Sequence, residues 1–301
     1  MDIKKDLISV CICTFKRPTL LSKALQHTVA QVTNDQFTYE IVVVDNDFRR
    51  SAEVIVSGYK IGNAVRIIYD CEPEQNIALA RNKAVKTATG NLIAFIDDDE
   101  RPVENWLLHM YSSLRKYSAS AVLGPVMPDY PWGTPKWLKK SGLCNRPRHK
   151  TGSLITRKDM RTGNILFCEY VFEKGELWFD PKRGLSGGED GEFISKQLDK
   201  GRKFIWCDEA IVYETVPENR WSVKFYLKRN YGIGTTAGTQ QHQNLKIHMA
   251  LKSLLLLVGY LVILPPALLC GKHNWIKIMI RIFYNAGFLF SFFRLVEVQK
   301  R

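Results

Sequence analysis

Four consecutive acids, Asp97-Asp98-Asp99-Glu100, are the residues of this sequence best suited to chemistry. Adjacent carboxylates repel one another, so such a cluster is costly unless a cation or several hydrogen-bond donors neutralise it. Carboxylate oxygens are the ligands that Mg2+ and Mn2+ prefer. The cluster therefore predicts a divalent metal site that holds a phosphorylated ligand. A solvated acidic turn, or an N-cap for the helix that follows Pro102, is the alternative.

The acids directly follow residues 92–96, a short apolar run typical of a strand that is covered on both faces. Earlier apolar runs predict further strands, and amphipathic segments between them predict helices. This alternation is typical of right-handed βαβ units, so we expect an α/β fold with a mainly parallel central sheet flanked by helices. The earlier strands and helices are expected at residues 7–14, 18–29, 39–44, 52–59, 64–69 and 76–88, and later strands at residues 119–126 and 163–172.

Polar residues follow three of the predicted strands. Thr14, Asp45 and residues 97–99 all come at carboxyl ends, and open α/β sheets bind their ligands at that edge. Neither GxGxxG nor GxxxxGK[ST] follows the first strand, so a dinucleotide-binding fold and a P-loop enzyme are not supported. A metal on the acidic cluster would then be the group that holds the phosphates.

The composition restricts the partners more than the fold. The chain has 301 residues and a net charge of +13, which is compatible with nucleic acid, an anionic membrane surface or phosphorylated substrates. No nucleic-acid-binding motif stands out, so we expect no nucleic acid as partner. No signal peptide is visible, and the seven cysteines lack a CxxC pair, which indicates reduced thiols in the cytosol.

Two apolar stretches end the chain. Residues 253–270 are uncharged and contain Pro265 and Pro266, and residues 276–296 carry three basic residues. Basic residues flank both stretches, and the positive-inside rule keeps such flanks in the cytoplasm. We therefore expect a re-entrant hairpin or interfacial helices on the cytoplasmic face of the plasma (inner) membrane, with a buried helical pair or a dimer interface as alternatives. The expected domains are a catalytic domain at 1–240 and a membrane-associating helical segment at 241–301.

Two further segments carry candidate functional residues. Residues 128–150 are rich in Pro, Trp, Gly and Lys, which is typical of a mobile lid that faces a sugar or a phosphate, or of an ordinary surface loop. Residues 185–192 place two glycines before acids that open a helix. Acids at a helix start are also favoured by the helix dipole alone.

Six segments in this order carry a family resemblance. The chain resembles the inverting family 2 glycosyltransferases with a GT-A fold, above all bacterial enzymes that build lipid-linked or surface polysaccharides. The resemblance covers residues 7–235. The segments are ISVCICTFKRP, EIVVVDND, NIALARNKAV, NLIAFIDDDE, GGEDGEF and VPENRWSVKFYLKRNYGIG.

The resemblance implies roles for individual residues. Asp97 and Asp99 match the DxD pair that binds Mg2+ or Mn2+. Asp190 matches the catalytic base, and Glu189 lies beside it. Many relatives have His where this chain has Glu214, which leaves open whether this position contacts the metal or the acceptor. The residues implied to contact the nucleotide are Thr14, Phe15, Arg17, Asp45, Arg81, Asn82, Asp98 and Arg229.

The predicted function is metal-dependent, inverting transfer of a sugar from a nucleotide-diphosphate donor to a hydroxyl of a glycan or lipid-linked saccharide, and the expected donor is a UDP-sugar. Retention of configuration is an alternative within the same class. A sugar-phosphate nucleotidyltransferase is a second alternative, but the glycine-rich basic loop that it needs after the first strand is absent. A non-enzymatic, basic membrane-binding module is a third, and it does not explain acids at three strand ends.

Overall fold

The computed structural model describes residues 5–174, 177–185, 187–242 and 247–299. They form two compact units, one made of the chain up to Pro128 with Arg146–Thr215, the other of Asp129–Asn145 with the chain from Val216 onwards. The second unit therefore begins before the expected boundary at residue 240. Whether catalysis and membrane contact divide at that boundary stays a prediction.

A seven-stranded sheet organises the first unit, in the order β3-β2-β1-β4-β8-β6-β9. All neighbours pair in parallel except β8, which is antiparallel to both β4 and β6. The expected mainly parallel sheet is confirmed. Its strands are β1 (Asp6–Thr14), β2 (Phe37–Asp45), β3 (Arg66–Cys71), β4 (Leu92–Phe95), β6 (Ala121–Leu123), β8 (Ile165–Cys168) and β9 (Phe204–Trp206).

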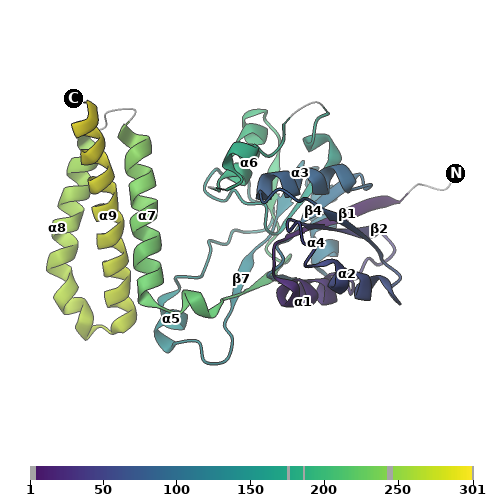
Figure 1. Ribbon diagram of the computed structural model, residues 1–301, viewed down its shortest axis with the longest axis horizontal. Helices are drawn as coiled ribbons and strands as arrows, with labels where there is room; N and C mark the ends of the chain where they lie inside the picture. Colours follow the sequence, from purple (N-terminus) through teal and green to yellow (C-terminus); the bar gives the residue numbers. More distant parts are fainter. Residues whose placement is uncertain (1–4, 175–176, 186, 243–246, 300–301) are drawn as a thin grey trace. The chain divides into compact units, whose positions relative to one another are not determined.

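Helices cover both faces of this sheet (Figure 1). Side chains alternate along β1, so Val10 packs with α1, α2 and α4 on one face, and Cys11 packs with α3 and α6 on the other. Asn76 caps α3 by accepting hydrogen bonds from the backbone N–H groups of Ala78 and Leu79. These helices are α1 (Pro18–Thr28), α2 (Glu53–Lys60), α3 (Ile77–Thr87), α4 (Trp106–Lys116) and α6 (Glu189–Asp199).

A smaller sheet has the order β5-β10-β7 and consists of β5 (Glu100–Pro102), β10 (Val212–Thr215) and β7 (Val126–Asp129). The strand expected over residues 119–126 is thus divided between β6 and β7, which belong to different sheets. Pro125 lies between them and has no N–H to continue a ladder. Residues 163–172 form only the short β8, followed by a 3-10 turn at Glu169–Val171.

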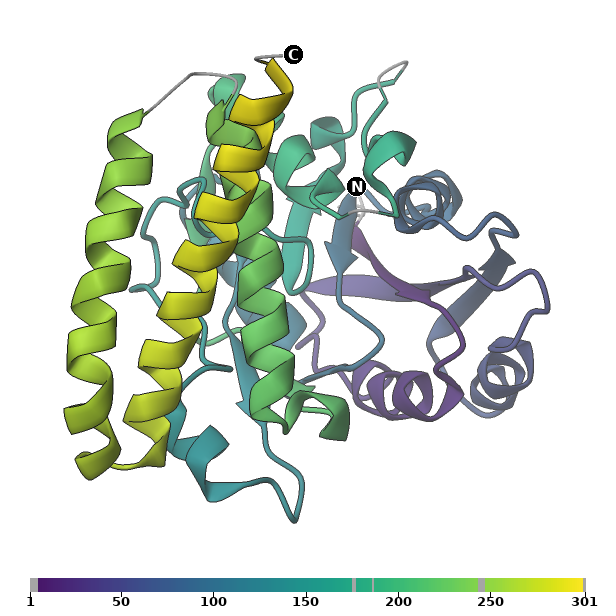
Figure 2. The same cartoon turned by 60° about the vertical axis from the view of Figure 1, so that its left-hand side comes forward.

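The second unit is helical, with α5 (Lys136–Ser141), α7 (Val223–His242), α8 (Ile247–Leu269) and α9 (Lys272–Gln299). The expected loop over residues 128–150 therefore contains a helix. The long helices α7, α8 and α9 lie side by side (Figures 1 and 2). Gly234 of α7 and Gly287 of α9 lie so close to the facing backbone that a Cβ at either would overlap a carbonyl oxygen. In the described chain, α8 and α9 are long and apolar enough to cross a membrane.

Candidate active site

The carboxyl edge of the main sheet gathers the predicted polar residues. The register of β1 and β2 places Thr14 beside Asp45. The register of β1 and β4 pairs Cys11 with Phe95, so residues 97–99 follow β4 at the same edge. The expected meeting of strand ends is confirmed, and it results from parallel pairing of three neighbouring strands.

Asp98 connects this edge to the start of α1. Its Oδ2 accepts a hydrogen bond of 2.8 Å from the Thr14 hydroxyl, and its Oδ1 lies 3.1 Å from Nη1 of Arg17. The same guanidinium nitrogen is 3.3 Å from Oδ2 of Asp99. Burial raises the pKa of Asp98, although Thr14 and Arg17 favour its charged form. Thr14, Arg17 and Asp98 therefore form one connected group, and their contact with a nucleotide stays a prediction.

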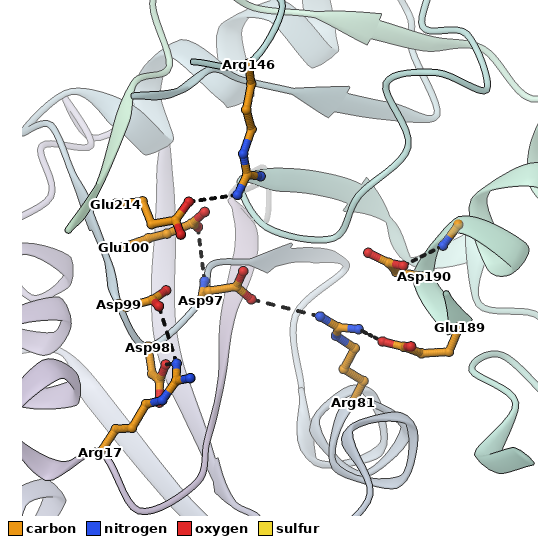
Figure 3. A network of polar contacts seen from close by, with 11 residues as sticks. Arg17, Arg81, Asp97, Asp98, Asp99, Glu100, Arg146, Glu189, Asp190 and Glu214 are labelled. Carbon is orange, nitrogen blue, oxygen red and sulfur yellow. Dashed lines mark hydrogen bonds and ion pairs between the residues drawn. The ribbon is translucent and has the colours of Figure 1, made fainter. Parts of the chain in front are cut away.

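Asp99 lies among other negative charges (Figure 3). Burial raises its pKa to about 7, and the neighbouring charges of Asp97 and Glu214 act in the same direction. The nearby Arg17 opposes this effect without cancelling it. A cation bound beside Asp99 would offset the repulsion among these carboxylates and favour the charged form of Asp99.

Glu100 adds a buried fourth acid. It pairs across β5 and β10 with Glu214, and its Oε2 accepts a hydrogen bond of 3.1 Å from the backbone N–H of Asp97. Among the described residues, no group donates a hydrogen bond to its buried Oε1. Burial, followed by the charge of Asp97, raises the pKa of Glu100 well above its usual range. A Cβ at Gly163 would lie 2.9 Å from both this Oε1 and Oδ2 of Asp97, so glycine leaves the space that these carboxylates occupy.

One basic residue of the segment 128–150 contacts the acids. Nη2 of Arg146 donates a hydrogen bond of 2.7 Å to Oε2 of Glu214 (Figure 3). Glu214, the position at which the resemblance implies His in many relatives, is thus an ion-paired carboxylate in this chain. That the segment opens and closes as a lid stays a prediction.

Arg81 links the strand-end acids to the start of α6. Its guanidinium forms a buried ion pair with Glu189, and its Nη2 lies 3.9 Å from Oδ1 of Asp97. Glu189 is the first residue of α6 and follows Gly188, whose φ of 94° lies in the left-handed region that favours glycine. The left-handed turn positions Glu189, and the ion pair neutralises it.

Asp190 is half-buried at the next position of α6. Its Oδ1 accepts a hydrogen bond of 2.7 Å from the backbone N–H of Gly191, and Figure 3 shows its carboxylate on the side of α6 that faces Asp97. Desolvation raises the pKa of Asp97, Arg81 opposes the effect, and the charge of Asp190 adds to it. Asp190 therefore lies within electrostatic reach of the strand-end acids. Among the described residues, no cation forms an ion pair with it.

Two residues that are expected to contact the nucleotide form side-chain hydrogen bonds within the protein. Asn82 donates a 2.8 Å hydrogen bond to the carbonyl of Phe179 and accepts one of 3.1 Å from its N–H. Asp45 is fully buried and accepts hydrogen bonds from the backbone N–H of Ala52 and the hydroxyl of Tyr69. This geometry supports structural roles for both side chains, and their contact with a nucleotide stays a prediction.

Two other expected nucleotide contacts are more accessible. Phe15 is half-buried at the end of β1, and Nζ of Lys16 lies 4.9 Å from the centre of its ring. Arg229 is exposed on α7 in the second compact unit. Both roles stay predictions.

The sequence interpretation included Glu100 only as a member of the acidic cluster, without a role of its own, and it gave no role to Arg146. Glu100 continues the acidic run, which is a local signal, whereas Arg146 meets Glu214 only through the tertiary fold. Within the described ranges, no three His, Cys, Asp or Glu side chains are close enough to form a ready-made metal site. The donor chemistry nevertheless fits a hard divalent cation, because Asp97, Asp99 and Glu100 are carboxylates whose charges are incompletely balanced.

A sequence comparison identifies the family. The profile of glycosyl transferase family 2 matches residues 9–174, which include most of β1, all of β2 to β4 and the acidic cluster. The chain belongs to glycosyl transferase family 2. It is therefore a glycosyltransferase, and its sheet and flanking helices are those of a GT-A fold.

Individual proteins are also similar to this chain. The chain is 32% identical over 234 residues to the succinoglycan biosynthesis protein ExoM of Rhizobium meliloti. The match covers 77% of this chain and 74% of ExoM. The chain is 23% identical to the chondroitin synthase of Pasteurella multocida, but spans only 25% of that protein's length. Among solved structures, S. aureus TarS 1-349 in complex with UDP-GlcNAc has a TM-score of 0.56 at 18% identity, covering 75% of this chain and 65% of that one. This last likeness concerns the fold.

Proposed function

We propose that this glycosyltransferase moves a sugar from a nucleoside-diphosphate donor, a UDP-sugar in the first instance, to a hydroxyl of a glycan or a lipid-linked saccharide. The observation that carries the proposal is that Asp190, which has no paired cation among the described residues, faces the strand-end acids across Arg81 (Figure 3). The name of ExoM, a succinoglycan biosynthesis protein, supports polysaccharide biosynthesis as the setting. The UDP-GlcNAc complex of TarS supports a UDP-sugar as donor.

The donor diphosphate would be held by the strand-end acids. Asp97 and Asp99 would bind a Mg2+ or Mn2+ ion, and Glu214 is a further carboxylate nearby. A bound divalent ion would neutralise the negative charge that develops on the leaving diphosphate. The raised pKa of Asp99 and the unpartnered oxygen of Glu100 support this assignment. Thr14 and Arg17 hold Asp98 in position beside the ion-binding acids.

The acceptor hydroxyl requires a base, because an oxygen that attacks the anomeric carbon must lose its proton. Asp190 suits this role better than Glu189, since Arg81 already occupies the Glu189 carboxylate. The acceptor oxygen forms its bond to the anomeric carbon as Asp190 takes the proton. The bond to the diphosphate breaks, and its electron pair leaves with the diphosphate. One base and no second nucleophile favour a single displacement, which inverts the anomeric configuration.

We further propose that the enzyme works at a membrane, on its cytoplasmic face. Helices α8 and α9 are candidate spans by length and composition, and only 11% of the apolar stretch of α8 is buried within the protein. Basic residues on both flanks of these helices support a peripheral or re-entrant arrangement. A lipid-linked acceptor would be presented at that surface.

Hydrolysis of a panel of nucleotide sugars, followed by NMR of the product anomer, tests the activity. We expect release of UDP from one UDP-sugar, stimulated by Mg2+ or Mn2+ and abolished by excess chelator. An inverted anomer supports single displacement, and a retained one contradicts it. Formation of pyrophosphate from a nucleoside triphosphate and a sugar phosphate would instead identify a nucleotidyltransferase.

A further inference from the structure

The net charge of the chain resides almost entirely in the second compact unit. Residues 129–145 and 216–301 contain 15 Lys and Arg but only 3 Asp and Glu, whereas the remaining residues contain 28 and 27, respectively. Twelve of the 13 net positive charges thus belong to the unit that also holds the two candidate membrane helices. Basic and apolar residues in one unit favour an anionic lipid surface as partner.

This unit contains a groove of about 400 Å³ between the end of α8 and the start of α9. Its lining includes the apolar Ile263 and Pro266 of α8 and Ile278 of α9. Two cations of α9, Lys277 and Arg281, line the same groove, and none of its lining side chains is acidic. The groove therefore combines an apolar wall with a positively charged one.

The two cations are available to a ligand. Lys277 and Arg281 are four residues apart, so they project from the same side of α9. Both are exposed, and neither has an acidic partner within the described residues. The guanidinium carbon of Arg281 lies 5.6 Å from the ring centre of Tyr260 on α8, which holds it toward the groove. The amide of Asn274 adds a polar group to the lining, although one of its N–H groups donates to the carbonyl of Cys270.

The proline pair favours the membrane interface over the hydrocarbon interior for this end of α8. Pro265 and Pro266 have no N–H, so they cannot bond the carbonyls of Leu261 and Val262 within the helix. Free carbonyls are costly in hydrocarbon and are readily hydrated at the membrane interface. Lys272 begins α9 directly after the turn, which also favours the interface. Apolar side chains exposed along α8 include Leu251, Leu255, Val258 and Val262.

We propose that the groove binds the phosphate headgroup of an anionic phospholipid. Lys277 and Arg281 contact the phosphate, and Ile263, Pro266 and Ile278 contact the first part of an acyl chain. The site goes beyond the proposed glycosyl transfer, because it assigns the membrane contact to two named cations. The phosphate of a lipid carrier and free phosphate are the other sources of the same chemistry.

Sedimentation of the full chain with vesicles tests the site. The vesicles contain phosphatidylcholine with or without phosphatidylglycerol, at one fixed salt concentration. The double variant Lys277→Gln/Arg281→Gln removes both groove cations, and Lys224→Gln/Lys228→Gln removes two exposed lysines with the same spacing on α7. Since a basic residue near an anionic surface contributes about 1 kcal/mol, we expect the groove variant to lose about 30-fold in partitioning to phosphatidylglycerol vesicles. The α7 variant should lose about threefold or less.

Equal losses in the two variants, or no loss in the groove variant, would overturn the site. Displacement from the vesicles by millimolar inorganic phosphate would overturn the lipid assignment in favour of free phosphate. Tighter, groove-dependent binding to phosphatidylcholine vesicles that carry polyprenyl phosphate would overturn the phospholipid in favour of a lipid carrier. Thermal unfolding confirms that the variants fold. Donor hydrolysis without vesicles should stay unchanged in both variants, which separates failure of this site from failure of the proposed activity.

Discussion

Arg81 lies between Glu189 and Asp97, in a buried ion pair with the first and 3.9 Å from Oδ1 of the second. It therefore connects α3, the start of α6 and the end of β4. The carboxylate of the adjacent Asp190 has no such cation within the part of the chain that the structure describes. The ion pair therefore indicates a structural role for Glu189 and leaves Asp190 as the candidate base.

Breaking the buried pair should destabilise the protein. Glu189→Gln leaves the Arg81 charge without its main partner, and loss of one member of a buried pair costs about 3–5 kcal/mol. The nearby Asp97 compensates in part, so we expect the lower end of this range in urea unfolding. The exposed pair Arg157–Asp199 provides the control, because Arg157→Gln should cost less than about 1 kcal/mol. Equal effects of the two variants would contradict a structural role for the Arg81–Glu189 pair.

Replacement of the candidate base should remove turnover and leave donor binding intact. In Asp190→Asn the amide oxygen can still accept the hydrogen bond from Gly191, so α6 should keep its start. We expect turnover to fall by about 10²–10⁴-fold, the usual contribution of general base catalysis, with an unchanged dissociation constant for the nucleotide. Glu192→Gln is the matched control in the same helical turn, since Glu192 is paired with Lys196 and Arg183. Near wild-type turnover in Asp190→Asn would remove Asp190 from this role.

Divalent cations should stabilise the protein more at high pH than at low pH. Without a cation, the pKa of Asp99 is about 7 in the folded state against an ordinary value of 3.8, so folding favours its protonated form. The resulting stability penalty is absent below pH 4, grows as the pH rises toward 7 and is complete above it, with a limit of about 4 kcal/mol. A bound cation removes this penalty.

Thermal unfolding at pH 5 and pH 8, in chelator and in Mn2+, measures the effect. We expect the rise in melting temperature on adding Mn2+ to be several degrees larger at pH 8, and to shrink in Asp99→Asn. An equal rise at both pH values would argue against Asp99 as a ligand.

Gly163 should tolerate no side chain. A Cβ there would lie 2.9 Å from oxygens of both Asp97 and Glu100, so one of these carboxylates must move. We expect Gly163→Ala to lose about 1–3 kcal/mol of stability, as overpacked sites do, together with most of its donor hydrolysis. At Gly58 of α2 no atom lies within 4 Å of the added Cβ, so Gly58→Ala should be neutral or slightly stabilising. Wild-type hydrolysis in Gly163→Ala would show that the two carboxylates need not keep their positions.

Local sequence patterns predicted those features that depend only on residues close together in the chain. The buried strands, the helix from Asn76 and the acids after β4 are all visible as apolar periodicity, a cap residue and a charge run. The pattern failed where neighbours in space decide the outcome. Residues 119–126 look like one strand, yet they enter two sheets, and the proline-rich segment 128–150 contains α5.

The sequence by itself determined that Thr14, Asp45 and the acidic cluster share one sheet edge, because parallel strands bring their carboxyl ends together. Only the tertiary structure decided how each side chain is used. Arg81 neutralises Glu189 across 108 residues of sequence, and Arg146 reaches Glu214 across 68. Such pairs leave no local signal, since they depend on which charges become buried together when distant elements pack.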